Sequence, residues 1–483
     1  MLPVLTPTKQ FHTMNQPPFQ PPPPPPPLGG PQKNLWQKQN DWARNSLLLK
    51  VFTVGLLILL SLIPITWIQD LIREREYRQT EAINSVNADW GNAQTVKGLV
   101  LTVPYKTYTK RKIYNEDPKA KPEYETITNR NYAYFLPEKL DIDGDVSSTQ
   151  LNRGLFEVVV YNSQVNFDGS FLFPDFKQWN IPEKDVLWDE ASVSLGISDL
   201  RSIQQQVTLN WDNGKYLFDP GVPTDEVIAK GISTKISLAN RDSSEIKFSL
   251  NFDFNGSSSL HFVPLGKTTN VNLKSGWKDP SFGGAFLPDQ REVTDHGFTA
   301  SWSVLHLNRP YPQSFTKNKY NIDNSEFGVN LIMPVDQYQK SMRAAKYAIM
   351  FITLTFMVFF FVQVMNNIRI HPIQYIMVGL ALCLFYTLLI SFSEHIPFMF
   401  SYAIASVAII GMVGLYTLTI FKHKRLTLYL SLILVALYLF IFTIIQMQDY
   451  ALLMGSIGLF IVLAITMYVS RKIDWFNLAA SKT

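Results

Sequence analysis

The sequence predicts an integral membrane protein with six transmembrane helices, arranged as one plus five, and a large exported domain of mainly antiparallel β structure. Six runs of the chain are apolar and free of charge. Each holds about 18 to 25 residues, which is enough to cross a hydrocarbon core of about 30 Å. Between the first and second runs, polar and apolar residues alternate. The six runs are residues 51–68, 347–365, 373–393, 397–421, 426–447 and 451–470.

The orientation follows from the positions of Lys and Arg, because short cationic connections are retained in the cytoplasm. The turns at 394–396 and 448–450, which lie on one side, contain no cation. We therefore predict that both termini are cytoplasmic and that residues 70–345 are periplasmic. The cations on the other side are Lys9, Lys33, Lys38, Arg44, Lys50, Arg369, Lys422, Lys424, Arg425, Arg471, Lys472 and Lys482.

The chain begins with a proline-rich segment, residues 1–46, which contains an unbroken run of proline at 21–27. Such a tract favours an extended polyproline conformation and cannot form a packed core. We therefore predict that this segment is a disordered cytoplasmic tail. Residues 471–483 are predicted to form a second, shorter cytoplasmic tail.

The first transmembrane helix is predicted at residues 47–69. No small-residue cleavage site follows it, which favours an uncleaved signal anchor. Mixed charges with apolar residues at helical spacing continue to Trp90, and Gly91 ends the pattern. The sequence therefore predicts an amphipathic helix that joins the first span rigidly to the exported domain.

The exported domain, residues 70–345, is predicted to be rich in β structure. Residues alternate with period 2 in runs such as 156–161, 247–254 and 298–304, and Asn, Asp, Gly and Pro separate these runs. We expect antiparallel strands in a β-sandwich or a related two-sheet domain. Residues 346–470 are expected to form a transmembrane domain of five helices.

The sequence contains no catalytic constellation. The nucleophile-elbow and zinc-protease motifs are absent, and the only cysteine, Cys383, lies in the third apolar run. His261, His296 and His306 lack the spacing of metal ligands. The net charge of +4 gives no reason to expect a nucleic-acid partner. We therefore expect no enzymatic activity, no metal and no cofactor.

One candidate interaction site lies in the run 280–288. The adjacent residues Gly283 and Gly284 permit close approach of the backbone, and Phe282 and Phe286 flank them. Two interpretations are open. The aromatic rings either pin a turn of the β domain or are presented to a partner.

A second candidate lies in the outer turn between the third and fourth apolar runs. The apolar runs after residue 346 contain no ionisable residue except Cys383 and tyrosines, which argues against a proton or ion relay. Glu394 and His395 in this turn are the nearest polar pair, and a histidine there can sense external pH. An ordinary loop pair is the other interpretation.

A third candidate is a set of four cations at the two membrane edges of the exported domain, Arg73, Arg75, Arg343 and Lys346. Both ends of the domain enter the same membrane, so these side chains are expected at similar depth. Long cationic side chains can reach lipid phosphates. We predict that the four form a basic collar against the outer face of the bilayer.

Several stretches resemble those of one family of bacterial inner-membrane proteins. They are Arg73-Glu74-Arg75, Trp90-Gly91, residues 98–105, 260–266, 280–288, 307–313, 334–341, 343–347 and 369–375, and Ser393-Glu394-His395-Ile396. Together they resemble the CreD family, described as cell envelope integrity proteins, over about residues 47 to 470. The resemblance implies an inner-membrane location and a role in envelope stress and colicin tolerance. It supplies no catalytic residues.

Three functions are open at this point. The leading hypothesis is a non-enzymatic scaffold or sensor of the envelope, whose partners are membrane lipids and another envelope protein or polymer. The alternative is a transporter or lipid-handling protein that uses the helix bundle as a path. An envelope hydrolase is the third hypothesis, because the sequence contains no recognisable catalytic groups.

Overall fold

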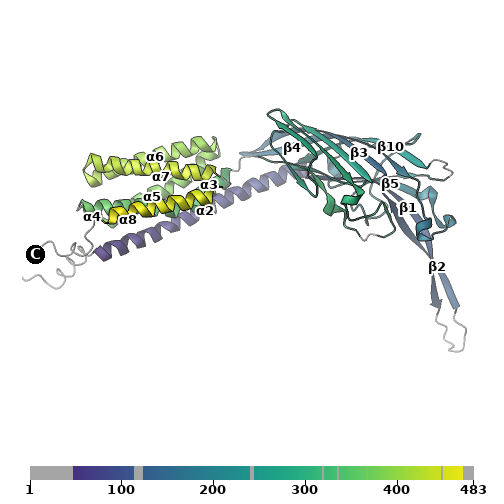
Figure 1. The fold of residues 1–483 in the computed structure, drawn as a ribbon, viewed down its shortest axis with the longest axis horizontal. Coiled ribbons are helices and arrows are strands. Elements are labelled where there is room, and N and C mark those ends of the chain that lie inside the picture. Colours follow the sequence, from purple (N-terminus) through teal and green to yellow (C-terminus); the bar gives the residue numbers. More distant parts are fainter. Residues whose placement is uncertain are drawn as a thin grey trace, which may run out of the picture.

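A computed structural model describes residues 47–113, 123–239, 244–317, 320–333, 337–366, 368–447 and 450–471. Helices gather in one half of the molecule and two β-sheets form the other half (Figure 1). The predicted tail at 1–46, and all but the first residue of the tail at 471–483, lie outside the described residues.

Helix α2, Leu47–Trp90, is continuous through 44 residues. At roughly 1.5 Å per residue it is about 66 Å long, which is twice the thickness of a hydrocarbon core. Its second half carries the charged, amphipathic sequence, so the predicted extension of the first span is confirmed. The helix ends at Trp90 and is followed by Gly91, whose φ of 141° favours glycine.

The first sheet is organised around β1, which pairs with three other strands. Its main path runs β13, β17, β11, β1, β5, β9 and β8, while β2 pairs with β1 and β16 pairs with β2. Its strands are β1 (Gln94–Ile113), β2 (Glu123–Phe135), β5 (Ala191–Ile197), β8 (Asp219–Pro220), β9 (Gly231–Ile236), β11 (Ser259–Val263), β13 (Pro280–Gly284), β16 (Ser314–Phe315) and β17 (Phe327–Leu331).

The second sheet has the order β14, β15, β12, β3, β4, β10, β6 and β7. Its centre is the long β3–β4 hairpin, in which Lys139 pairs with Ser170 and Arg153 pairs with Phe156. Its strands are β3 (Lys139–Arg153), β4 (Phe156–Leu172), β6 (Thr208–Trp211), β7 (Gly214–Leu217), β10 (Glu245–Ser257), β12 (Thr268–Ser275), β14 (Gln290–Thr294) and β15 (Gly297–Leu305).

Both sheets are mixed. Strand β1 is parallel to β11, and β3 is parallel to β12. The other described pairings are antiparallel, so the mainly antiparallel arrangement predicted from alternation is correct for most of the domain. Alternation does not distinguish the two directions, and the parallel pairs join strands that are distant in the chain.

The two sheets share one apolar core. Every second residue of β3 and β10 points inward over much of their length, as their alternating burial shows. Large side chains fill the interior, and each contributes about 1.5–3 kcal/mol through burial of apolar surface. The largest of these fully buried side chains in the domain are Trp211, Tyr134, Tyr161, Phe167, Phe171, Phe252, Phe254, Phe262 and Phe327.

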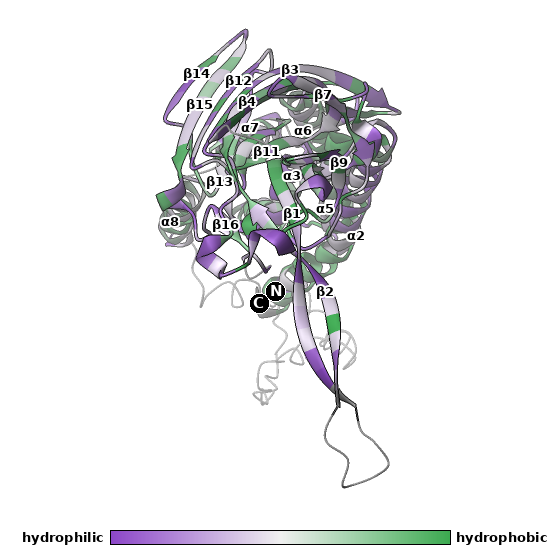
Figure 2. Cartoon of the chain, turned by 90° about the vertical axis from the view of Figure 1, so that its right-hand side faces the viewer, coloured by the Kyte–Doolittle hydropathy of each residue, from purple (hydrophilic) through white to green (hydrophobic). Residues whose placement is uncertain are grey.

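One part of the first sheet leaves this core. Strands β1 and β2 stay paired out to Ile113 and Glu123, and the ribbon projects from the end of the domain that is remote from the helices (Figures 1 and 2). Its outer residues are exposed, including Tyr108 and Tyr124.

The helical half contains α2 and the six helices that follow the sheets. Among the described residues, six helices, namely α2 and α4 to α8, are long and apolar enough to cross a membrane. The helices after the sheets are α3 (Gln337–Lys346), α4 (Ala348–Met365), α5 (Pro372–Ser393), α6 (Phe398–Phe421), α7 (Lys424–Gln446) and α8 (Ala451–Ser470).

Helix α3 lies within the predicted exported domain, residues 70–345, but packs with the apolar helices. Its residues Tyr338, Ala344 and Ala345 are buried in the same apolar cluster as the transmembrane helices, not in the core of the β domain. The last strand, β17, ends at Leu331. Packing therefore assigns α3 to the helical half.

Candidate functional site

The membrane edge of the molecule contains an ion pair between two helices. Nε of Arg75 on α2 lies 3.6 Å from Oε1 of Glu394, the residue that follows α5. The Tyr338 hydroxyl of α3 donates a hydrogen bond of 3.2 Å to the same oxygen. The side chain of Glu394 is only 12% exposed, against 38% for Arg75. Three helices therefore meet at one largely buried carboxylate.

This arrangement has an electrostatic reason. The last carbonyl groups of a helix carry partial negative charge, so a carboxylate at the C-terminus of α5 is in an unfavourable place. Burial adds a desolvation cost unless the charge is paired and hydrogen-bonded. Arg75 and Tyr338 offset both effects, and they do so only while α2 and α3 stay beside α5. The stabilisation of the Glu394 carboxylate thus depends on how the three helices are arranged.

The other predicted membrane-edge residues do not join this cluster. His395 is exposed, and its side chain forms no hydrogen bond or ion pair with any described residue. Arg343 is half-buried and Lys346 is exposed, and neither forms an ion pair within the described part of the chain. Arg73 pairs with Asp70 at 2.8 Å. Two of the four cations of the predicted collar, Arg73 and Arg75, thus already have carboxylate partners, and contact of the four with lipid remains a prediction.

At its other end, α2 is fixed to the second sheet. The indole N–H of Trp90 donates a hydrogen bond of 3.2 Å to the carbonyl oxygen of Tyr161 on β4. Asp89 pairs with Arg153 of β3 at 3.1 Å. Val86 of the helix is buried with Val158 and Val160 of β4. The helix therefore contacts the β domain through apolar packing and polar bonds together.

The chain leaving α2 is held by a second polar cluster. The Asp199 carboxylate accepts hydrogen bonds from Arg201 Nη2 at 2.8 Å and from the Asn92 amide at 2.8 Å. The hydrogen bonds from Arg201 are the main cause that lowers the pKa of Asp199 from 3.8 to about 2. Asn92 directly follows the helix stop, so this charged cluster ties the end of α2 to the loop after β5.

The 280–288 segment contains a strand as well as the expected turn. Residues Pro280–Gly284 form strand β13, which pairs with β17. Phe282 packs edge-on against Phe298 with centroids 5.5 Å apart, and Phe286 packs against Phe327 at 5.8 Å. Both rings are partly buried against the core, which supports the pinning interpretation.

Only one of the two glycines there is required by the backbone. Gly284 has a φ of +99°, and a Cβ at that position would lie 2.3 Å from the carbonyl oxygen of Glu326. Gly283 would place a Cβ 3.6 Å from the side-chain amide of Asn330, an ordinary contact. The structure therefore has a close approach of the backbone at Gly284, whereas a side chain at Gly283 would have room.

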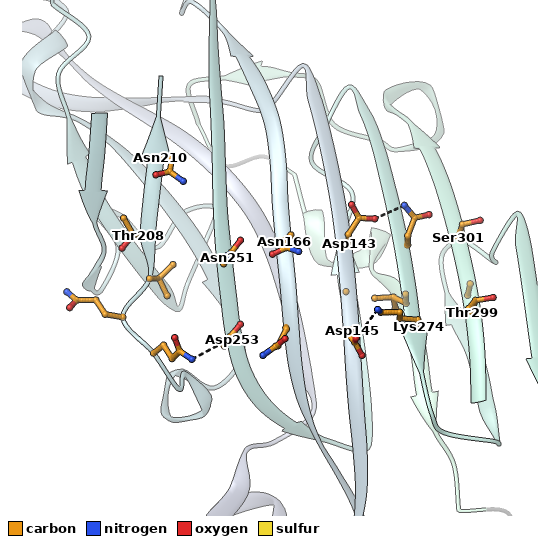
Figure 3. A pocket seen from close by; sticks show the side chains of 18 of the residues that line it. Asp143, Asp145, Asn166, Thr208, Asn210, Asn251, Asp253, Lys274, Thr299 and Ser301 are labelled. Carbon is orange, nitrogen blue, oxygen red and sulfur yellow. Dashed lines mark hydrogen bonds and ion pairs between the residues drawn. The ribbon is translucent and has the colours of Figure 1, made fainter. Parts of the chain in front are cut away.

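The outer face of the second sheet carries a site that the sequence did not reveal. A groove of about 1480 Å³ lies over the eight strands of this sheet and the segment before β6 (Figure 3). We call it the polar groove. Its floor contains two polar rows that cross the strands. The first row is Gln290, Ser301, Asn272, Asp143, Asn166 and Asn251. The second row is Glu292, Thr299, Lys274, Asp145, Gln164 and Asp253.

The rows exist because the strands share one register. Side chains at every second position of a strand point to the same face, and directly paired residues of neighbouring strands stand side by side. At roughly 4.8 Å between strands, each row is about 24 Å long. Some members bond within the protein: the Asn272 amide donates to Asp143 at 2.8 Å, and Lys274 pairs with Asp145 at 3.0 Å.

No metal site accompanies the groove or the membrane edge. Within the described ranges, no group of three or more His, Cys, Asp and Glu side chains is placed to hold a metal ion. Among the described histidines, His261 lies 3.8 Å from Glu326 and sits in β11. The groups that the groove can offer to a ligand are the hydrogen-bonding and charged side chains of its lining.

The interior of the helix bundle is filled by aromatic rings. Phe385 packs against Tyr438 with centroids 4.7 Å apart and against Tyr402 at 5.2 Å. Phe351 packs against Tyr438 at 4.5 Å. The Tyr402 hydroxyl donates a hydrogen bond of 2.8 Å to the carbonyl oxygen of Tyr438. These contacts join α4, α5, α6 and α7 around one aromatic centre.

Comparison with known proteins gives a clear family match. Residues 46–476 match the family described as "Inner membrane protein CreD". The chain is also 29% identical over 429 residues to the "Inner membrane protein CreD" of Escherichia coli (strain K12), covering 88% of this chain and 93% of that protein.

Solved structures give much weaker likenesses. An M1 zinc metallopeptidase from Deinococcus radiodurans is 6% identical with a TM-score of 0.17, covering 35% of this chain and 38% of that one. A mutant of an M1 zinc metallopeptidase from the same organism, bound to a Tyr-Ser-Ala substrate, is 8% identical with a TM-score of 0.19, covering 44% and 53%. Likenesses this low carry no argument about fold or activity.

Proposed function

The chain belongs to the CreD family of inner membrane proteins, and from this premise we propose that it is a non-enzymatic scaffold or sensor of the cell envelope. In this proposal the β domain lies in the periplasm, meets another envelope component there, and is coupled mechanically to the helix bundle. The proposal includes a role in envelope integrity and in stress or colicin tolerance, which the family resemblance implies.

The observation that carries the proposal is the continuity of α2. One helix runs from the helical half into the β domain, with Arg75 paired to Glu394 near its middle and Trp90 bonded to β4 at its end. A flexible linker would allow the two halves to move independently. A helix held at both ends transmits a displacement of the β domain to the bundle, or holds the domain in a fixed pose.

The proposed topology has both termini in the cytoplasm and residues 70–345 in the periplasm. It rests on the distribution of Lys and Arg in the short connections. Alkaline phosphatase fused after Ser257 should be active, and the same enzyme fused after Lys422 should be inactive. The reverse pattern would overturn the topology.

The coupling is tested by exchanging the charges of the membrane-edge pair in cells that lack their own copy of the protein. Arg75→Glu and Glu394→Arg should each increase uptake of a membrane-impermeant dye, because each leaves two like charges facing one another. The double variant restores a pair of opposite charges, so its dye uptake should return part of the way to the wild-type level.

Arg78→Glu is the matched control. Arg78 lies on the same helix, and its only ion pair among the described residues is with Glu74 of that helix, at 2.7 Å and with both side chains more than half exposed. This variant should behave like the wild type. Single exchanges at Arg75 and Glu394 that leave dye uptake unchanged, at equal abundance in the membrane, would contradict the proposal.

A further inference from the structure

The polar groove presents hydrogen-bonding groups whose charges are largely balanced. Its lining includes Asp143, Asp145, Asp253 and Glu292 against Lys215, Lys274 and Arg291. Several of these are already satisfied: Lys274 with Asp145, the Asn272 amide with Asp143, and the Gln205 amide with Asp253 at 3.1 Å. A strongly anionic or cationic ligand would find no uncompensated field there, so the complementary ligand is uncharged.

The centre of the floor is different, because its amides are free. Gln164, Asn166 and Asn251 are exposed, and their side chains form no hydrogen bond with any other described residue. Asn166 stands directly opposite Asn251, and Gln164 lies two residues before Asn166 on the same strand. Each amide offers one acceptor and two donors. Together they form a short patch that can both donate hydrogen bonds to hydroxyl and acetamido groups and accept hydrogen bonds from them.

The size of the groove indicates an extended ligand. Its volume of about 1480 Å³ exceeds the 300–1,000 Å³ of ordinary small-molecule pockets. The two polar rows run across the strands, so an elongated ligand would lie across the sheet. The backbone groups under the rows are already paired within the sheet, which excludes recognition by strand addition.

Most residues that line the groove are polar or charged. Val207, Leu217, Leu273 and Ala300 are its apolar members, and none is aromatic. Acyl chains need a continuous apolar surface to offset the loss of hydration of polar groups. The lining therefore disfavours lipid tails.

We propose that the polar groove binds a segment of an uncharged glycan chain, held by hydrogen bonds from Gln164, Asn166 and Asn251 to its hydroxyl and acetamido groups. This inference rests on the proposed function, which puts the β domain in the periplasm, and it names the class of the envelope component that the domain meets.

Binding is measured on the full-length protein in detergent, with two uncharged probes: a hexasaccharide of N-acetylglucosamine and maltohexaose. The Asn166→Ala/Asn251→Ala double variant removes the central amides. Both positions are exposed, so the fold should be retained. Asn152→Ala is the matched control, because Asn152 is an exposed asparagine of β3 that lies outside the groove.

At least one uncharged probe should bind to the wild type and to Asn152→Ala. The double variant should bind it about tenfold more weakly, as expected for the loss of one or two hydrogen bonds. Equal binding by wild type and double variant, or no binding of either probe, would overturn the proposal. So would binding of an anionic polymer alone, such as heparin. The charge-exchange experiment does not depend on these outcomes, so failure of the glycan site and failure of the coupling are distinguishable.

Discussion

Arg75 of α2 and Glu394 at the end of α5 form an ion pair across the membrane edge, with Nε and Oε1 3.6 Å apart. The two residues come from opposite sides of the β domain in the chain, one before its first strand and one after its last. Their contact therefore connects the helix that enters the domain to the bundle that follows it. Tyr338 of α3 completes the connection through its hydrogen bond to Glu394.

We predict a measurable coupling energy for this pair. Arg75→Gln and Glu394→Gln should each lower the thermal stability of the purified protein, and the double variant should lose less than the sum of the two. The expected coupling is about 1 kcal/mol, because the carboxylate is largely buried while the arginine is partly exposed. Thermal unfolding in detergent measures it. Arg78→Gln, which removes an exposed pair within α2, should change the stability little, and strictly additive effects at Arg75 and Glu394 would refute the coupling.

The Asp199 cluster predicts a pH-dependent contribution to stability. The pKa of Asp199 is lowered to about 2 in the folded protein, chiefly by the hydrogen bonds from Arg201. Its contribution is therefore fully present above the ordinary value of 3.8 and is lost as the pH falls through about 2. Asp199→Asn should lower the free energy of unfolding at pH 7.

The difference between Asp199→Asn and the wild type should narrow as the pH falls from 3.8 toward 2, the interval set by the ordinary and the lowered pKa. Urea unfolding at pH 7, 5 and 3 follows this change. Asp225→Asn is the control, because Asp225 is exposed and forms no ion pair with any described residue. A difference that stays constant down to the lowest pH would show that the charge of Asp199 is not the cause.

The two glycines of β13 predict opposite responses to alanine. Gly284→Ala should destabilise the domain by about 1–3 kcal/mol or more, because φ is positive and the new Cβ meets the carbonyl oxygen of Glu326 at 2.3 Å. Gly283→Ala should be close to neutral, since its Cβ has room. Chemical denaturation of the two variants compares them directly. If both variants lost the same free energy of unfolding, any added methyl group in this strand would be destabilising, and the positive φ of Gly284 would not be the cause.

The course of α2 could be predicted from the sequence, whereas α3 could not. In α2 the helical pattern continues past the apolar run to Trp90, and a glycine follows it. Helix α3 is short and mostly polar, and its buried residues include the small side chains Ala344 and Ala345. Its place is determined by contacts with α2, α5 and α7, which a local pattern does not contain.

The polar groove shows that prediction from local sequence patterns has the same limit in the β domain. Alternation in β3 predicts that Asp143 and Asp145 share a solvent-facing side. It does not predict that Asn272 and Lys274 stand beside them, because that depends on the parallel pairing of β3 with β12. The ion pair of Arg75 with Glu394 likewise joins residues that the sequence assigned to separate candidate sites. Long-range pairing, rather than residue type, was the missing information.

The aromatic centre of the bundle provides the last prediction, which concerns two tyrosines that face one another. Tyr402 donates its hydroxyl hydrogen to the carbonyl oxygen of Tyr438 at 2.8 Å. The hydroxyl of Tyr438 is buried and has no hydrogen-bond partner among the described residues. Tyr402→Phe should therefore cost about 1 kcal/mol, whereas Tyr438→Phe should be neutral or stabilising because it removes an unpaired polar group.

Thermal unfolding of the two variants in the same detergent tests this order, since both substitutions remove one oxygen and keep the ring. The aromatic packing of Phe385 against both rings is retained in either variant. A larger loss for Tyr438→Phe than for Tyr402→Phe would mean that the Tyr438 hydroxyl has a partner in the membrane, such as a water or a polar ligand inside the bundle. That result would favour a path through the helices over a packed structural core.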